Sequence, residues 1–257
     1  MSFVSTPHGV RLSFVDSGGP GRPILALHGA FGRGRSFMPL AERLGRRVIA
    51  PDQRGHGLSD KPGDYSREGF LADAAAFIEA LDLAPVTIVG HSLGAINAYQ
   101  LAARRPELVE SFVAIDFPAE AGAFTDPWLD ELPDRFASLT QLEQALKRVV
   151  STDVPGHFLE SAFEDERGWG FLWNAEDIRA TKRGIAGSWW DDWTSSPQPA
   201  LLVVGGASPV APRAPEMIAR RPHTRLVTIP GAGHDLYLSH TDALAEAIAT
   251  FLPTPVA

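Results

Sequence analysis

The sequence contains no cysteine, which excludes disulfide bonds, thiol catalysis and cysteine-ligated zinc. It has no excess of basic residues either: the formal net charge is -8, whereas binding to nucleic acid requires concentrated Lys and Arg. No apolar run reaches the roughly 18 residues that a membrane span needs. Residues 1–10 lack the basic segment and apolar run of a secretory signal. We therefore expect a cytoplasmic protein with no nucleic acid or membrane partner.

The sequence does contain enough apolar residues for a large core, since 44% of its 257 residues are hydrophobic. Short apolar runs alternate with helical patterns, which is typical of parallel βαβ units in a doubly wound α/β sheet. We expect this core to comprise residues 1–117 and 200–257. The expected strands are 10–15, 24–27, 47–50, 86–89, 112–115, 201–204 and 226–229, and the expected helices are 68–81, 93–104 and 242–251.

Residues 118–199 interrupt the alternation. This segment has a mostly helical pattern broken by Pro and Gly, and it contains all six tryptophans of the chain. We expect it to form a small helical cap inserted between two strands. The tryptophans would mostly fill the core of this cap, while one or two would line an apolar pocket beneath it.

A G-x-S-x-G motif, Gly90-His-Ser92-Leu-Gly94, lies between an expected strand and an expected helix. A serine at a sharp strand-to-helix turn has a strained backbone, and the flanking glycines remove Cβ atoms that would clash there. The turn would present Ser92 Oγ as a nucleophile at the carboxyl end of the sheet. The amide of Leu93, at the helix N-terminus, would stabilise an oxyanion. The motif alone is a weak signal, but its position between strand and helix makes it specific.

A second oxyanion donor is expected after the strand 24–27, where the sequence reads His28-Gly-Ala30. The amide of Ala30 is the natural donor. His28 directly follows a buried strand, so we expect it to hold the turn by hydrogen bonding; the alternative role is that of a catalytic base. The same interpretation applies to His56, in the tight loop from Asp52 to Gly57.

A serine hydroxyl is unreactive at neutral pH unless a base accepts its proton. The best candidate is His234, in the glycine-rich loop that follows the last expected strand. This loop would lie at the same sheet edge as Ser92. The alternative is a histidine on a surface loop. We expect His240 to cap a helix, and His91 to point away from the site because neighbouring side chains diverge at a sharp turn.

These motifs occur in an order and at spacings that resemble the α/β-hydrolase superfamily across nearly the whole chain. The resemblance implies an eight-stranded, mostly parallel sheet with a helical cap inserted after the sixth strand. It also implies catalysis that needs no cofactor or metal.

One position departs from the superfamily pattern. The acid that orients the histidine usually follows the seventh strand, but Ser208 stands there in this chain. We expect Asp116, at the end of the sixth strand, to be the acid; the alternative is that it caps a turn before Pro118. Asp235 and Glu120 are weaker candidates. The segment around Asp116 and the acid-less loop resemble the (acetamidomethylene)succinate hydrolases.

Together these residues predict a serine hydrolase that cleaves an ester, lactone or amide of a small, partly apolar substrate. Alternatives are perhydrolysis of the haloperoxidase type or carbon–carbon bond hydrolysis with the same triad, and a non-catalytic small-molecule receptor. The oligomeric state stays open. The expected substrate contacts are Phe31, Phe117, Trp189 and Trp190. Five arginines could pair with a substrate carboxylate or simply be solvated: Arg135, Arg148, Arg167, Arg179 and Arg183.

Overall fold

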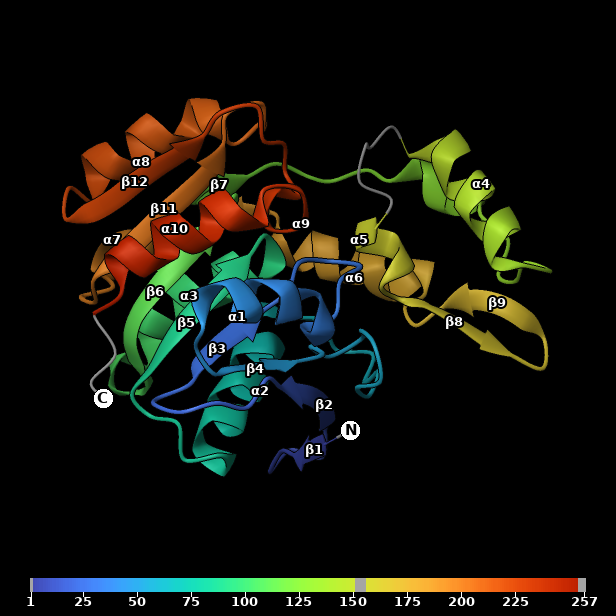
Figure 1. Ribbon diagram of the computed structural model, residues 1–257, viewed down its shortest axis with the longest axis horizontal. Helices are drawn as coiled ribbons and strands as arrows, with labels where there is room; N and C mark the ends of the chain where they lie inside the picture. Colours follow the sequence, from blue (N-terminus) through green and yellow to red (C-terminus); the bar gives the residue numbers. More distant parts are fainter. Residues whose placement is uncertain (1, 151–155, 254–257) are drawn as a thin grey trace.

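The computed structural model describes residues 2–150 and 156–253 (Figure 1). An eight-stranded sheet runs through its centre in the spatial order β1-β2-β4-β3-β5-β6-β11-β12. The strands are β1 (Ser2–Ser5), β2 (Arg11–Asp16), β3 (Ile24–Leu27), β4 (Val48–Pro51), β5 (Val86–His91), β6 (Val109–Ile115), β11 (Ala200–Gly205) and β12 (Thr224–Ile229).

The sheet is mostly parallel. Strand β2 pairs antiparallel with both β1 and β4, and all other neighbouring strands pair in parallel. The eight-stranded, doubly wound α/β fold expected from the sequence is therefore confirmed. The edge strand β1 was not expected. Its four residues are too few to show a recognisable strand pattern. They form a strand because they pair with β2.

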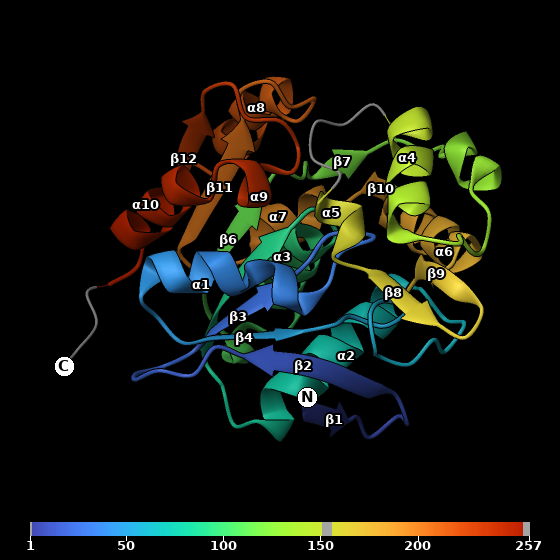
Figure 2. The same cartoon turned by 45° about the vertical axis from the view of Figure 1, so that its right-hand side comes forward.

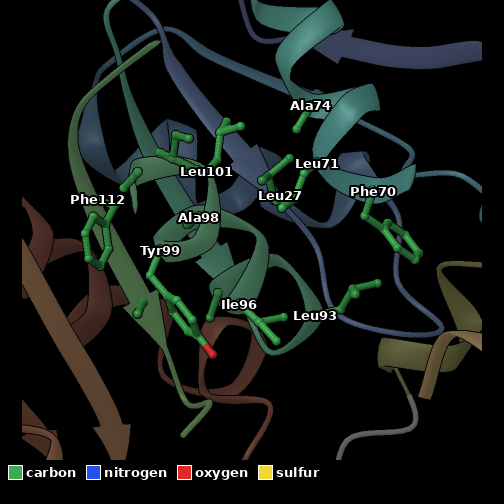
Figure 3. Packing of buried hydrophobic residues seen from close by; sticks show 14 of the residues in the cluster. Leu27, Phe70, Leu71, Ala74, Leu93, Ile96, Ala98, Tyr99, Leu101 and Phe112 are labelled. Carbon is green, nitrogen blue, oxygen red and sulfur yellow. The ribbon is translucent and has the colours of Figure 1, made fainter. Parts of the chain in front are cut away.

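Helices cover both faces of the sheet because each central strand is apolar on both sides. In β3, Leu25 and Leu27 pack toward α2, α3, α7 and α8, whereas Ile24 and Ala26 pack toward α1, α9 and α10. Figure 3 shows Leu27 against Leu71 of α2, among the apolar side chains of α3. The core helices are α1 (Met38–Leu44), α2 (Arg67–Ala80), α3 (Leu93–Arg104), α7 (Trp190–Ser195), α8 (Ala214–Arg220), α9 (Leu236–Ser239) and α10 (Thr241–Phe251).

The segment between β6 and β11 forms the cap, and most of it projects to one side of the sheet (Figures 1 and 2). It combines helices with two small antiparallel sheets, β7–β10 and β8–β9, so it is less uniformly helical than its sequence pattern indicates. Short strands around Gly168 and Gly187 give little periodic signal. The cap elements are β7 (Glu120–Ala121), α4 (Leu139–Val149), α5 (Gly156–Leu159), β8 (Ala162–Asp165), β9 (Gly168–Phe171), α6 (Ala175–Ile185) and β10 (Gly187–Ser188).

The cap has its own apolar core, in which Phe31 of the sheet domain packs with Phe158 and Trp173 of the inserted segment. The last helix of the insertion, α7, packs against α3 of the sheet domain instead. Its Trp193 is fully buried in the main core. Among the described residues, no helix is both long and apolar enough to cross a lipid bilayer.

Candidate active site

Ser92 stands at the sharp turn between β5 and α3. Its backbone has φ 52° and ψ -111°, a left-handed conformation that is unfavourable for a residue with a side chain. The turn closes only because Gly90 and Gly94 have no side chains: a Cβ on Gly90 would lie 2.1 Å from the carbonyl oxygen of Gly94, and one on Gly94 would lie 1.9 Å from that of Leu27. The local sequence thus forces the hydroxyl out of the sheet.

His234 lies in the loop between β12 and α9, at the same end of the sheet. Its Nδ1 donates a hydrogen bond of 2.7 Å to Oδ2 of Asp116. This bond fixes the ring tautomer and leaves Nε2 unprotonated, so that it can accept a proton. The structure therefore brings Asp116 and His234, 118 positions apart in the sequence, into direct contact.

Asp116 directly follows β6 and is fully buried. Its backbone also has a positive φ, 53°. The carboxylate is held on both oxygens: Oδ1 accepts the amide of Gly205 at 2.9 Å, and Oδ2 accepts the hydroxyl of Ser208 at 2.5 Å. Ser208, at the usual acid position, thus donates to the carboxylate supplied by the neighbouring strand.

The pKa of His234 is raised above its ordinary value. Burial by itself lowers this pKa, but the hydrogen bond to Asp116 and the negative charges of Asp116 and Asp235 together outweigh it. Asp116 therefore stabilises the imidazolium form, which is the form that a general base becomes when it has taken a proton.

Ser92 and His234 border one cavity of about 210 Å³ under the cap. The described residues show no hydrogen bond between the Ser92 hydroxyl and the His234 ring, and none from the amides of Ala30 or Leu93 to a protein acceptor. Both amides therefore have no hydrogen-bond acceptor among the described residues. Ala30 borders the cavity, whereas Leu93 is buried at the start of α3. The cavity is lined by Ala30, Phe31, His91, Ser92, Asp126, Trp128, Val150, His157, Phe158, Lys182, His234 and Asp235.

The cap contributes a residue that the sequence did not single out, His157 of α5. Its Nε2 donates to the carbonyl oxygen of Ala30 at 2.7 Å, and its Nδ1 accepts the hydroxyl of Tyr237 at 2.8 Å. Burial lowers the pKa of His157, which fits a neutral ring with one donor and one acceptor. His157 thereby connects the Ala30 loop to α9. No motif surrounds it, so only its position in the fold identifies it.

Three other buried histidines have structural contacts. His28 donates from Nδ1 to the carbonyl of Gly29 and accepts the Gln53 amide at Nε2. His91 donates from Nε2 to the carbonyl oxygen of His234 at 2.9 Å, and so supports the histidine loop. His56 bonds to the carbonyl of Arg54. Burial lowers the pKa of all three, that of His56 to about 4, so each ring is neutral at pH 7.

Of the four expected substrate contacts, the structure brings only Phe31 to the cavity. Phe117 is buried and stacks on Phe124. Trp189 donates to the carbonyl of Ile185, and Trp190 donates to Glu120. Trp189 and Trp190 pack as partly buried residues against the main core. Trp128 is the tryptophan that lines the cavity.

The five cap arginines do not border this cavity either. Arg135 and Arg167 line a separate cavity of about 450 Å³ on the cap, which includes neither Ser92 nor His234. Arg179 pairs with Asp130 at 2.7 Å, and Arg148 and Arg183 are exposed. Among the described residues, the Lys or Arg that does border the cavity at Ser92 is Lys182, which no sequence motif singled out.

One group of side chains in the described residues could bring three metal-ligand atoms within 4.8 Å of one another: His91, His234 and Asp235. One ring nitrogen of His91, Nε2, donates to a backbone carbonyl, and the other, Nδ1, is buried beside Gly29 with no hydrogen-bond partner among the described residues. Nδ1 of His234 is already bonded to Asp116. The arrangement fits the proton-transfer pair His234–Asp116 better than a metal site.

Comparisons with known proteins identify the family of this chain. Residues 24–247 match the model of the Alpha/beta hydrolase family. A 2-(acetamidomethylene)succinate hydrolase from Mesorhizobium japonicum is 32% identical over 250 residues, covering 91% of this chain and 89% of the relative. An sn-1-specific diacylglycerol lipase from Xenopus tropicalis is 28% identical, covering 95% of this chain and 82% of the lipase.

Solved structures give the same result. The crystal structure of an E-2-(acetamidomethylene)succinate hydrolase superposes with a TM-score of 0.84 at 29% identity, covering 97% of each chain. A marine microorganism esterase superposes with a TM-score of 0.80 at 27% identity, covering 94% of this chain and 99% of the esterase. From the family match, the shared fold and these relatives, the chain is a hydrolase that belongs to the alpha/beta hydrolase family.

Proposed function

We propose that this protein is a serine hydrolase that cleaves an ester, lactone or amide of a small, partly apolar substrate through an acyl-enzyme. One observation carries the proposal. Ser92, in a strained strand-to-helix turn, borders the same cavity as His234, whose Nδ1 is held at 2.7 Å by the buried carboxylate of Asp116. A nucleophile, a base and a group that orients the base form the constellation needed for acyl transfer.

In the first half of the reaction, Ser92 Oγ attacks the substrate carbonyl carbon while His234 Nε2 takes the hydroxyl proton. The carbonyl oxygen becomes an oxyanion, which the amides of Leu93 and Ala30 stabilise. The tetrahedral intermediate then collapses. The bond to the leaving group breaks, His234 returns its proton to that group, and the acyl group remains on Ser92.

In the second half, a water molecule gives its proton to His234 and attacks the acyl carbon. The new tetrahedral intermediate releases the acid product, and the proton returns from His234 to Ser92 Oγ. Asp116 stays ionised throughout and stabilises the imidazolium form of His234 in both halves. The raised pKa of His234 suits a group that first takes a proton and then returns it.

The relatives support this reaction class without fixing the substrate. Two of them are named as a hydrolase of 2-(acetamidomethylene)succinate and as a diacylglycerol lipase, which differ widely in substrate. The cavity favours a small and partly apolar molecule, because it measures about 210 Å³ and is bordered by the aromatic rings of Phe31, Trp128 and Phe158.

A covalent label tests the proposal directly. A fluorophosphonate should react with Ser92 alone, and mass spectrometry of the digested protein should locate the adduct there. Ser92→Ala should abolish labelling and lower hydrolysis of p-nitrophenyl butyrate by several orders of magnitude. The alanine variant should keep the circular dichroism spectrum and melting temperature of the wild type. Unlabelled wild-type protein, or a variant with near-full activity on any substrate of the wild type, would refute the mechanism.

A further inference from the structure

The cavity bordered by Ser92 and His234 also carries an ion pair from the cap. Lys182, on α6, and Asp126, just before the 3-10 turn Pro127–Glu131, both border the cavity. Their side chains are only 17% and 12% exposed. Burying a lysine costs side-chain entropy and the hydration of its ammonium group. A lysine that only kept the surface hydrated would not need this position, so the position favours a ligand-binding role.

The pair is held in a fixed orientation. Lys182 Nζ donates to Oδ1 of Asp126 at 2.8 Å, and Trp128 Nε1 donates to the same oxygen at 3.3 Å. The ammonium also lies 5.0 Å from the ring centre of Phe31 and 5.6 Å from that of Phe124. No other hydrogen bond of Lys182 Nζ or of Asp126 Oδ2 is formed within the described residues. The pair therefore offers a ligand both donors and an acceptor.

The charges around the cavity decide which ligands fit. Among the described residues that border it, two carboxylates, Asp126 and Asp235, stand against the single ammonium of Lys182, which Asp126 already neutralises. His157 is neutral, because burial lowers its pKa. The negative charge of Asp116 lies behind His234 and is balanced when that ring holds a proton. A substrate that carried carboxylates would meet the negative charge of Asp235, which no cation among the described residues neutralises.

We infer that the Lys182–Asp126 pair recognises an uncharged group that both donates and accepts hydrogen bonds, a hydroxyl or a carboxamide, and that the cavity discriminates against carboxylate-bearing substrates. The group would accept from Lys182 Nζ and donate to Asp126 Oδ2 while the reacting carbonyl lies at Ser92. The inference rests on the proposed serine mechanism. It separates this chain from its relative named for a succinate derivative.

The test uses ethyl p-nitrophenyl alkylphosphonates, in which Ser92 Oγ attacks phosphorus and p-nitrophenolate leaves. The alkyl arms end in a methyl, a hydroxyl or a carboxylate group, in a four-carbon and a six-carbon series. In at least one series we expect the hydroxyl arm to inactivate the protein about tenfold faster than the methyl arm, and the carboxylate arm about tenfold slower than the methyl arm. One hydrogen bond to a charged group changes a rate constant by about this factor.

Two variants then assign the effect to the pair. Lys182→Met should remove the advantage of the hydroxyl arm over the methyl arm. Asp126→Asn should bring the rate of the carboxylate arm closer to that of the hydroxyl arm, because it leaves Lys182 without its counter-charge. Arg183→Met is the matched control, since Arg183 follows Lys182 on α6 but is exposed and outside the cavity. It should leave all ratios as in the wild type.

The outcomes separate this inference from the proposed function. If no phosphonate reacts with Ser92, the serine mechanism itself fails. If Ser92 reacts but the carboxylate arm is fastest, Lys182 is a carboxylate clamp and the inference is wrong. Equal rates for the three arms, or ratios unchanged in Lys182→Met, also overturn it.

Discussion

The hydroxyl of Ser208 lies 2.5 Å from Oδ2 of Asp116, the same oxygen that accepts Nδ1 of His234. Ser208 follows β11 and Asp116 follows β6, and these two strands are parallel neighbours in the sheet. The acid can therefore come from either strand end and still lie beside the histidine loop. In this chain β6 supplies the carboxylate, and the β11 loop supplies donors that hold it, the Ser208 hydroxyl and the Gly205 amide.

Replacing the acid should reduce catalysis and leave the fold intact. We expect Asp116→Asn to lower kcat for p-nitrophenyl butyrate by roughly three orders of magnitude, because an amide does not stabilise the imidazolium of His234. Asparagine tolerates the positive φ at this position, so the melting temperature should change little. Steady-state kinetics and thermal denaturation measure the two effects.

The acid swap provides the control. Adding Ser208→Asp to Asp116→Asn places a carboxylate within reach of His234 and should recover at least about tenfold of the lost kcat. A single Asp116→Asn variant with wild-type kcat would contradict the role of Asp116.

The dependence of activity on pH follows from the raised pKa of His234. A base must be neutral to accept a proton, so activity should fall as the pH drops through this pKa. The midpoint of the acid limb should therefore lie above the ordinary histidine value of about 6.5. Asp116→Asn removes the charge that raises the pKa, so its residual acid limb should shift to lower pH. Profiles of kcat/KM between about pH 5 and 9 test this; identical limbs in both proteins would count against it.

His157 should affect catalysis through the Ala30 loop. His157→Leu leaves the Ala30 carbonyl without its donor, so the loop and its oxyanion amide lose their fixed position. We expect kcat to fall by about tenfold to 100-fold, approaching the loss of one oxyanion donor. Tyr237→Phe is the control: it keeps the bond from His157 to Ala30 and should cost less. Equal kcat for His157→Leu and the wild type would show that the cap does not hold this loop.

Trp193 should contribute to stability and not to catalysis. It is fully buried, packs edge-on against Tyr99 and Phe112, and donates to the carbonyl of Met217 at 3.0 Å. Trp193→Ala should lower the free energy of unfolding by about 3–5 kcal/mol. The partly buried Trp190 provides the comparison, and its alanine variant should lose only about 1 kcal/mol. Urea denaturation measures both; similar losses would contradict the difference in burial.

Much of the sheet domain could be predicted from local sequence. The run from Ile24 to Leu27 and the stretch from Leu93 to Arg104 have the bounds that were expected. Their patterns are clear because a strand or helix buried in a parallel sheet domain must be apolar on definite faces. The turn at Ser92 was equally readable, because Gly90 and Gly94 are needed where backbones approach too closely for a Cβ.

The cap and the cavity were decided by tertiary structure. The sequence placed Trp189 and Trp190 at the substrate, but the fold packs them against the main core and brings Trp128, His157 and Lys182 to Ser92 instead. Composition shows that a segment is aromatic, but not which way each ring faces once short strands and helices pack together.

The sequence by itself determined the chemical identities at the centre of the site: a serine in a glycine-flanked turn, a histidine in a late loop and an aspartate after β6. Tertiary structure decided that Asp116 and His234 meet at 2.7 Å, that Ser208 holds the acid, and that Lys182 is paired within the cavity. The physical reason is the distance along the chain over which each kind of constraint acts. Steric and periodic constraints act between neighbours in the chain, whereas these contacts join residues 56 to 118 positions apart and depend on how strands and helices pack in the fold.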